Sequence, residues 1–126
     1  LELLKKLKKT RKNHRNNKNS LAIHGLAHIT GGGLKDNIER LLPEKYRAVI
    51  HKTNIEPLPI FQYIQKAGRV SEKEMFKTFN MGVGFVIIAP QESNHTIKSF
   101  IKNQGGGLKA FDIGEIVEGE KGVEFI

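Results

Sequence analysis

The sequence predicts an α+β domain in which helices pack on a mixed β-sheet. Three observations favour this fold class. Apolar residues recur with helical spacing in several segments, short β-branched runs alternate with them, and the chain closes with two strand-like segments around a turn. Alternation alone would also suit a purely parallel sheet, but a terminal hairpin and short connections favour a mixed one. The 126 residues are enough for one buried core.

Residues 1–20 differ from the rest of the chain in charge. They carry eight Lys/Arg and one Glu, a net charge of +7, whereas residues 21–126 have a net charge of +1. Leu1, Leu4 and Leu7 have helical spacing and predict the end of a linking helix. The second half of this segment lacks apolar side chains, so we expect a basic flexible loop there. Because the sequence starts inside a helical pattern, we expect it to begin partway through a longer protein.

The first part of residues 21–126 predicts a strand, a helix and a second strand. A mostly apolar run from Leu21 to Ile29 predicts a short buried strand that runs into a glycine turn. A helix follows and ends before Pro43, and Tyr46 to His51 predicts the next strand. The residues that give this helix its apolar face are Leu34, Ile38, Leu41 and Leu42.

Two helices are predicted next. Pro57 and Pro59 suit the first turn of a helix that Gly68 closes. Ser71 and Glu74 have the spacing of a capping box, which predicts a second short helix leading to Asn80. The apolar faces of the two helices are formed by Leu58, Phe61 and Ile64 in the first and by Met75, Phe76 and Phe79 in the second.

A continuous apolar run from Val83 to Ala89 is rich in β-branched residues and predicts the central strand of the sheet, covered on both faces. Ser93 or Asn94 is expected to cap a further helix, which ends at the glycines 105–107. Its inward side chains are predicted to be Ile97, Phe100 and Ile101.

The C-terminal residues predict a β-hairpin. Phe111, Ile113 and Val117 indicate a strand, residues 118–122 form a charged, glycine-containing turn, and residues 123–126 are expected to pair back on that strand.

The composition excludes several classes of protein. The chain has no cysteine, which rules out disulfides, thiolate zinc sites and thiol nucleophiles. No apolar run approaches the roughly 20 residues of a membrane-spanning helix, and nothing resembles a secretory signal. A cytoplasmic protein is therefore expected.

Two Gly-Gly-Gly sequences occur in different contexts. Gly31, Gly32 and Gly33 lie between a predicted strand and the start of a helix, where free N–H groups and the positive end of the helix dipole favour an anion such as phosphate. Thr30 adds a hydroxyl donor, although on spacing alone a plain turn is the commoner explanation of such residues. The second set, Gly105–Gly107, follows a helix, so a helix stop is expected there.

Two long blocks carry a family resemblance. Residues 24–34 read His-Gly-Leu-Ala-His-Ile-Thr-Gly-Gly-Gly-Leu and are followed by Asp36, Asn37 and Ile38. Residues 74–84 read Glu-Met-Phe-Lys-Thr-Phe-Asn-Met-Gly-Val-Gly. In this order they strongly resemble the signatures of the C-terminal domain of phosphoribosylformylglycinamidine cyclo-ligase, also called aminoimidazole ribonucleotide synthetase.

The resemblance implies an activity for the full-length protein. Members of the family are homodimers that use ATP and Mg²⁺ to close formylglycinamidine ribonucleotide into 5-aminoimidazole ribonucleotide in purine biosynthesis. Their N-terminal domain supplies most ATP and metal ligands, and it is absent from this chain. We therefore expect the chain alone to bind no ATP or Mg²⁺ and to be inactive.

The resemblance also implies site residues. It places Thr30, Gly31, Gly32 and Gly33 in a cradle for the substrate phosphate, with His28 as a catalytic candidate and Asn80 as a substrate contact. Against these roles, a histidine on an apolar strand is commonly a hydrogen-bonded core residue, and Asn80 suits a turn. His24 and His28 lack an evident third ligand, so no metal site is expected.

Other functions remain open at the sequence level. Formylglycinamidine ribonucleotide synthetase, selenophosphate synthetase and thiamine-monophosphate kinase resemble this family in architecture, and their motifs match the two blocks less well. The basic residues 5–18 also suit a non-specific arm for RNA, although they offer no aromatic side chain for base stacking. We expect neither nucleic acid nor membrane as a partner.

Overall fold

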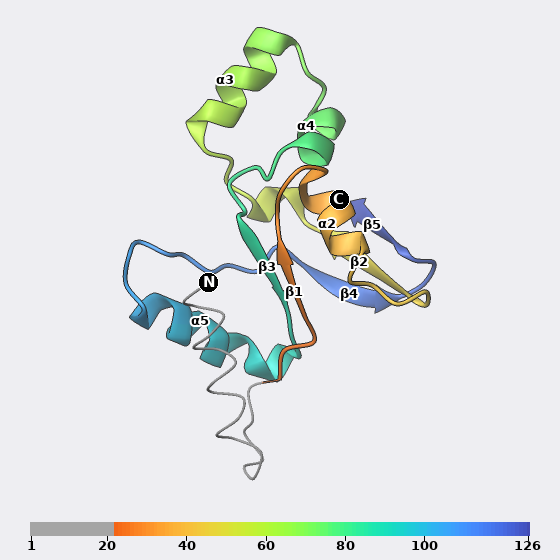
Figure 1. The fold of residues 1–126 in the computed structure, drawn as a ribbon, viewed down its shortest axis with the longest axis vertical. Coiled ribbons are helices and arrows are strands. Elements are labelled where there is room, and N and C mark those ends of the chain that lie inside the picture. Colours follow the sequence, from red (N-terminus) through yellow and green to blue (C-terminus); the bar gives the residue numbers. More distant parts are fainter. Residues whose placement is uncertain (1–21) are drawn as a thin grey trace. The chain divides into compact units, whose positions relative to one another are not determined.

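A computed structural model describes residues 22–126, in which five strands, four α-helices and two 3₁₀ helices follow one another (Figure 1). The predictions for residues 1–20 lie outside the described residues. By their contacts, residues 26–87 and 111–126 form one compact unit, and residues 22–25 and 88–110 belong to another. The elements are β1 (Gly25–His28), α2 (Gly33–Glu39), β2 (Tyr46–Ile50), η1 (Lys52–Asn54), α3 (Pro59–Gly68), α4 (Glu72–Thr78), β3 (Phe85–Ile88), η2 (Gln91–Ser93), α5 (Asn94–Asn103), β4 (Gly114–Glu118) and β5 (Gly122–Phe125).

The three-stranded sheet is mixed, as predicted, and its order is β4-β2-β5. In this sheet β2 pairs antiparallel with β4, where Ala48 faces Ile116, and parallel with β5, where Ala48 faces Val123. The predicted C-terminal hairpin is wrong, because β2 lies between β4 and β5. The turn after β4 passes across the start of β2, and the Gly119 N–H donates to the Lys45 carbonyl at 3.0 Å.

The position predicted for β3 is also wrong. Within residues 22–126, β3 belongs to a two-stranded sheet with β1, and the centre of the larger sheet is β2. In β3, Val86 is buried, whereas the other three residues are half-buried. The prediction that this strand is covered on both faces is therefore only partly confirmed, and an apolar run does not specify which strands lie beside it.

The core of the larger unit lies between the three-stranded sheet and two short helices. Leu34 and Ile38 of α2 and Met75 of α4 are almost completely buried. The ring of Phe76 packs against Phe125 of β5 with centroids 5.2 Å apart. The apolar stripes predicted for these helices therefore face the core, except that Leu41 lies beyond the end of α2 and is exposed.

The helix ends largely follow the predicted signals. Pro59 occupies the first turn of α3, and the Glu74 N–H at the start of α4 donates to Ser71 Oγ at 3.3 Å. In the other unit, α5 begins after Ser93, whose side chain makes no capping bond, and it ends just before the glycines 105–107. Its predicted inward residues Ile97 and Ile101 are buried.

Among residues 22–126, no helix is both long and apolar enough to cross a membrane. The cytoplasmic location stays a prediction.

Candidate functional site

The glycine turn predicted between β1 and α2 is present. Gly31 and Gly32 form the turn, and Gly33 is the first residue of the helix. Gly32 and Gly33 have φ angles of 92° and 60°, a region in which side chains are strained. The Gly33 N–H donates to the Thr30 carbonyl at 3.1 Å, which closes the turn.

Asn37, in the middle of α2, holds this loop in shape. Its side chain is buried, and its amide nitrogen donates to the carbonyl of Gly33 at 2.7 Å, of Gly31 at 3.3 Å and of Thr30 at 3.4 Å. In a trans peptide the N–H points away from the carbonyl of the preceding residue. Because the Thr30 and Gly31 carbonyls turn toward Asn37, the N–H groups of Gly31 and Gly32 turn away from it.

The third glycine has a packing role. A Cβ atom on Gly33 would lie 2.6 Å from the carbonyl oxygen of Phe76 and 2.8 Å from that of Lys77. The start of α2 thus touches the last turn of α4, where the positive end of one helix dipole meets the negative end of the other. Since its own N–H bonds to Thr30, Gly33 shapes the loop and offers no free donor.

Thr30 and Asp36 set the polarity around the loop. Thr30 is exposed, and its hydroxyl lies 3.5 Å from Asn37 Oδ1, at the limit of a hydrogen bond. A Cβ atom on Gly32 would lie 2.7 Å from Asp36 Oδ2. The carboxylate of Asp36 therefore adjoins the loop and opposes part of its positive potential.

His28 is exposed on β1, so its alternative interpretation as a core residue is wrong. Its ring stacks on Phe85 of β3 with centroids 6.3 Å apart and an interplanar angle of 27°. One face of the imidazole is fixed by this contact. Within residues 22–126 no group of three potential metal ligands is present, around His24 and His28 or elsewhere.

Asn80 forms the tight turn that the alternative interpretation predicts. Its Oδ1 accepts a hydrogen bond from the Gly82 N–H at 2.9 Å, and its carbonyl accepts one from Val83 at 2.8 Å. The two central residues, Met81 and Gly82, have φ angles of 53° and 93°. The side-chain oxygen is therefore committed to the chain itself.

The fold brings the two sequence blocks together. The Ile29 N–H donates to the Gly84 carbonyl at 3.0 Å, and His28 stacks on the next residue, Phe85. Gly33 touches the end of α4, which lies in the second block. Three separate contacts thus join segments that are about 40 residues apart in the sequence.

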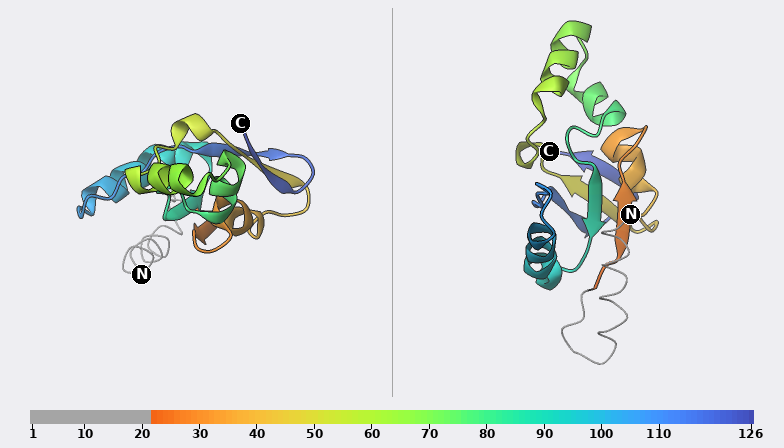
Figure 2. Two further views of the ribbon diagram at one scale, coloured as in Figure 1. Left: turned by 90° about the horizontal axis from the view of Figure 1, so that it is seen from above. Right: turned by 60° about the vertical axis from the view of Figure 1, so that its left-hand side comes forward.

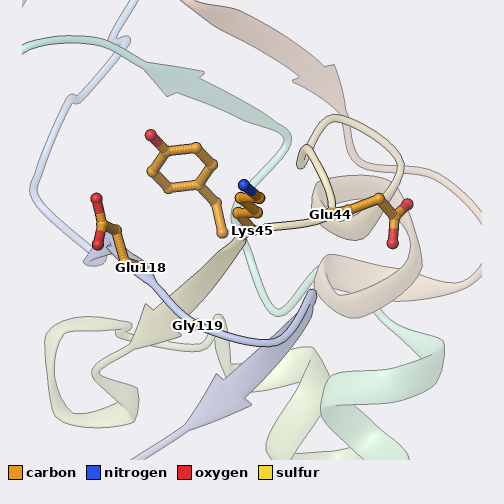
Figure 3. A pocket seen from close by; sticks show the side chains of 5 residues that line it. Glu44, Lys45, Glu118 and Gly119 are labelled. Atoms are coloured by element: carbon orange, nitrogen blue, oxygen red, sulfur yellow. The ribbon is translucent and has the colours of Figure 1, made fainter.

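A shallow pocket elsewhere contains none of the predicted site residues. It lies where β2 begins and β4 ends, and it is lined by Glu44, Lys45, Tyr46, Glu118 and Gly119. Figure 3 shows the carboxylates of Glu44 and Glu118 on opposite sides of Lys45. The Glu44 carboxylate forms an ion pair with Lys121, with Oε1 and Nζ 3.2 Å apart. The polar groups do not converge, so the glycine loop remains the candidate site.

Sequence reasoning missed Asn37, although a signal was present. The residue lies three positions after Leu34 and beside Ile38, so it falls on the apolar face of α2. A polar side chain on such a face needs hydrogen-bond partners when buried. The carbonyls of the glycine loop are those partners.

Comparisons with known proteins identify the family of the chain. The family described as "AIR synthase related protein, C-terminal domain" matches residues 2–126. Three relatives called phosphoribosylformylglycinamidine cyclo-ligase are similar: 46% identity over 101 residues in Gloeothece citriformis, 44% over 104 in Geotalea uraniireducens, and 45% over 98 for a chloroplastic protein of Arabidopsis thaliana.

These alignments cover 80%, 82% and 78% of the chain but 29%, 29% and 25% of the relatives. The chain thus spans less than a third of the length of the curated relatives it matches. Because the family extends over nearly the whole sequence and over both signature blocks, the chain belongs to the AIR synthase related C-terminal domain family.

Proposed function

We propose that this chain is the substrate-side domain of a phosphoribosylformylglycinamidine cyclo-ligase. The relatives that carry this name support the activity, and the contact between the two signature blocks supports a site at the glycine loop. The observation that carries the proposal is the set of Asn37 hydrogen bonds, which turn two loop carbonyls inward.

The proposed role of the loop is to hold the phosphate of formylglycinamidine ribonucleotide. The N–H groups of Gly31 and Gly32 and the hydroxyl of Thr30 are the donors, and Gly33 keeps the backbone free of a side chain at the start of α2. Donors that are already oriented stabilise an anion without a further ordering cost. The phosphate would be held in place while the ring closes at the other end of the substrate.

His28 and Asn80 are proposed to lie along the same substrate. The exposed imidazole, fixed on one face by Phe85, is suited to hydrogen-bond a polar group of the ligand. Because Asn80 Oδ1 bonds to Gly82, the side-chain amide nitrogen is the part of Asn80 that we propose for contact.

ATP and Mg²⁺ would bind to the part of the full-length protein that the relatives possess and this chain lacks. Mg²⁺ is held by carboxylates and phosphate oxygens, and residues 22–126 contain no cluster of three suitable side chains. When bound, ATP supplies the phosphoryl group that activates the formyl oxygen. We propose that the working assembly is a homodimer of the full-length protein.

A chimaera tests the activity. This chain would replace the matching part of the Geotalea uraniireducens relative, and ADP release would be measured with ATP and Mg²⁺. We expect release that depends on formylglycinamidine ribonucleotide. No response to this substrate, together with ATP consumption on selenide, thiamine monophosphate or formylglycinamide ribonucleotide with glutamine, would assign the chain to a sister enzyme instead.

Thr30→Val in the same chimaera tests the site, because it removes one donor and keeps the side-chain shape. We expect the KM for the substrate to rise about 10- to 100-fold, the effect of one hydrogen bond to a charged group. An unchanged KM would remove Thr30 from the site.

A further inference from the structure

Helix α3 carries an apolar surface that the described chain does not cover. Leu58, at its N-cap, and Ile60 and Tyr63 within it are 56%, 54% and 69% exposed. No residue of α3 is buried, although the helix is strongly amphipathic. Three of the nine exposed large apolar side chains among the described residues thus lie within six positions. Clustering of this kind marks an interaction surface, whereas single exposed apolar residues are ordinary.

Helix α3 has two apolar edges, and one of them packs against other residues of the chain. At 3.6 residues per turn its apolar positions span an arc of about 160°. Phe61 and Ile64 lie toward one edge and are half-buried. Phe61 packs on Phe79, which follows α4, with ring centroids 6.0 Å apart. Figures 1 and 2 show α4 beside α3.

Ile60, Tyr63 and Ala67 form the other edge, which we call the α3 stripe. They recur at i, i+3 and i+7, so they lie in one row along the helix, and all three are exposed. An isolated surface helix needs a single apolar face to pack against its own domain. The extra edge therefore indicates a second packing partner.

The charges beside the stripe indicate the chemistry of that partner. Lys66 lies next to Tyr63 on the helix surface, and Arg69 follows at the helix end. Both are exposed, and within residues 22–126 neither has an ion-pair partner. A complementary surface would be apolar at its centre and carry carboxylates at its rim.

The surface is also continuous with the second signature block. A Cβ atom on Gly82 would lie 3.6 Å from Leu58 Cγ, so the turn that contains Asn80 abuts the N-terminal end of α3. A partner that covered Leu58 and the stripe would reach this turn. The surface is thus placed to connect docking with the proposed substrate site.

We infer that the α3 stripe docks the N-terminal part of the cyclo-ligase relatives, through an apolar patch edged with carboxylates. This inference rests on the proposed function, which requires that part for ATP binding. The matched region covers 29% of the Geotalea uraniireducens relative, which leaves roughly 70% of that protein to supply the partner. Docking there joins the ATP-binding part to the turn at Asn80.

The test is a binding measurement between separate proteins. The N-terminal part of the Geotalea uraniireducens relative would be expressed alone and titrated calorimetrically with the 126-residue chain, without ATP, metal or substrate. Tyr63→Asp and Ile60→Asp are each expected to weaken binding about 30-fold or more, as for anchor residues of an interface. The matched control is Leu108→Asp, since Leu108 is 53% exposed outside α3, and it should change the Kd less than about 3-fold.

Further measurements distinguish a loss of docking from a loss of folding. Far-UV circular dichroism and thermal melting of each variant would show that loss of binding is not unfolding. Lys66→Glu with Arg69→Glu should weaken binding and reduce its dependence on salt. No binding by the parent chain at about 100 μM, well above a typical specific Kd, would overturn the inference. Equal affinity of Tyr63→Asp and Leu108→Asp would also overturn it.

A second copy of the chain is the competing occupant. Sedimentation of the chain alone would detect a dimer, and a dimer that Tyr63→Asp disperses would contradict the commitment to the N-terminal part. Because these experiments contain no substrate, docking can succeed while the chimaera fails to release ADP. The inference and the proposed function can therefore fail separately.

Discussion

Asn37 links the packing of α2 to the shape of the glycine loop. Its buried amide donates to three loop carbonyls, and each would lose a partner in Asn37→Ala. Two of the three bonds are 3.3 Å or longer and therefore weak. We expect the unfolding free energy to fall by about 2 kcal/mol, which is the contribution of two good hydrogen bonds rather than three. Urea denaturation of the 126-residue chain measures this. Exposed Asn103→Ala is the control, and a loss below about 0.5 kcal/mol would show that water replaces the amide.

Gly33 and Gly31 form a matched pair for testing the loop. In Gly33→Ala the new methyl group would meet the Phe76 carbonyl at 2.6 Å, and the residue has a φ of 60°. The clash and the left-handed backbone together should cost about 3 kcal/mol. At Gly31 no atom lies within 4 Å of the added Cβ, and its φ is not positive, so Gly31→Ala should change stability by less than about 1 kcal/mol. Equal losses in the two variants would contradict the assigned packing role of Gly33.

Asp36 affects the affinity of the loop for anions rather than its shape. The carboxylate lies beside Gly32, so Asp36→Asn removes a negative charge while keeping the side chain's size. We expect affinity for ribose 5-phosphate to rise about 2- to 5-fold at low salt, the usual size of a charge effect at a helix end. NMR titration of the Gly31 and Gly32 amides would measure it. Glu39→Gln, at the other end of α2, should leave the affinity unchanged, and equal effects would indicate a merely general charge effect.

The residue-scale features of the candidate site could be predicted in part. The strand–glycine–helix order and Thr30 follow from local sequence, because glycine and helix-start signals act over a few residues. The contact between Gly33 and α4 could not be derived, since it depends on how two helices pack that are distant in sequence. For Asn37, the apolar pattern reveals an anomalous position but not which carbonyls meet the amide.

At the scale of elements, helices were predicted better than strand partners. The capping box at Ser71 and the apolar spacing of α2 and α5 specify helices through local hydrogen bonds and one buried face. The two errors, a hairpin of β4 with β5 and a central β3, both concern pairing. Alternation and apolar runs record which faces are buried, whereas pairing is set by long-range packing. In this protein β2 lies between β4 and β5, so these two strands do not pair with each other.

The cap of α4 gives an element-scale prediction. Ser71→Ala removes the acceptor for the Glu74 N–H and should destabilise the chain by about 1 kcal/mol. Thermal or urea unfolding measures the loss. Ser99→Ala, in the interior of α5, serves as the control, since alanine is the better helix former there. A loss of equal size at Ser99 would mean that the Ser71 hydroxyl acts through general packing rather than as a cap.

At the scale of the whole molecule, the activity expected of the chain alone depends on how much of its relatives it covers. It contains the glycine loop but matches less than a third of each relative. We therefore expect no ADP release when the 126-residue chain is mixed with ATP, Mg²⁺ and formylglycinamidine ribonucleotide. Adding the N-terminal part of the Geotalea uraniireducens relative should restore release, because that part would bind ATP and Mg²⁺ while this chain binds the substrate phosphate. Restoration should fail with Tyr63→Asp at low concentration and recover as the concentration rises, since that variant weakens docking and leaves the glycine loop intact. Turnover by the chain alone would show that it binds ATP by itself, and the division of roles between the two parts would then be wrong.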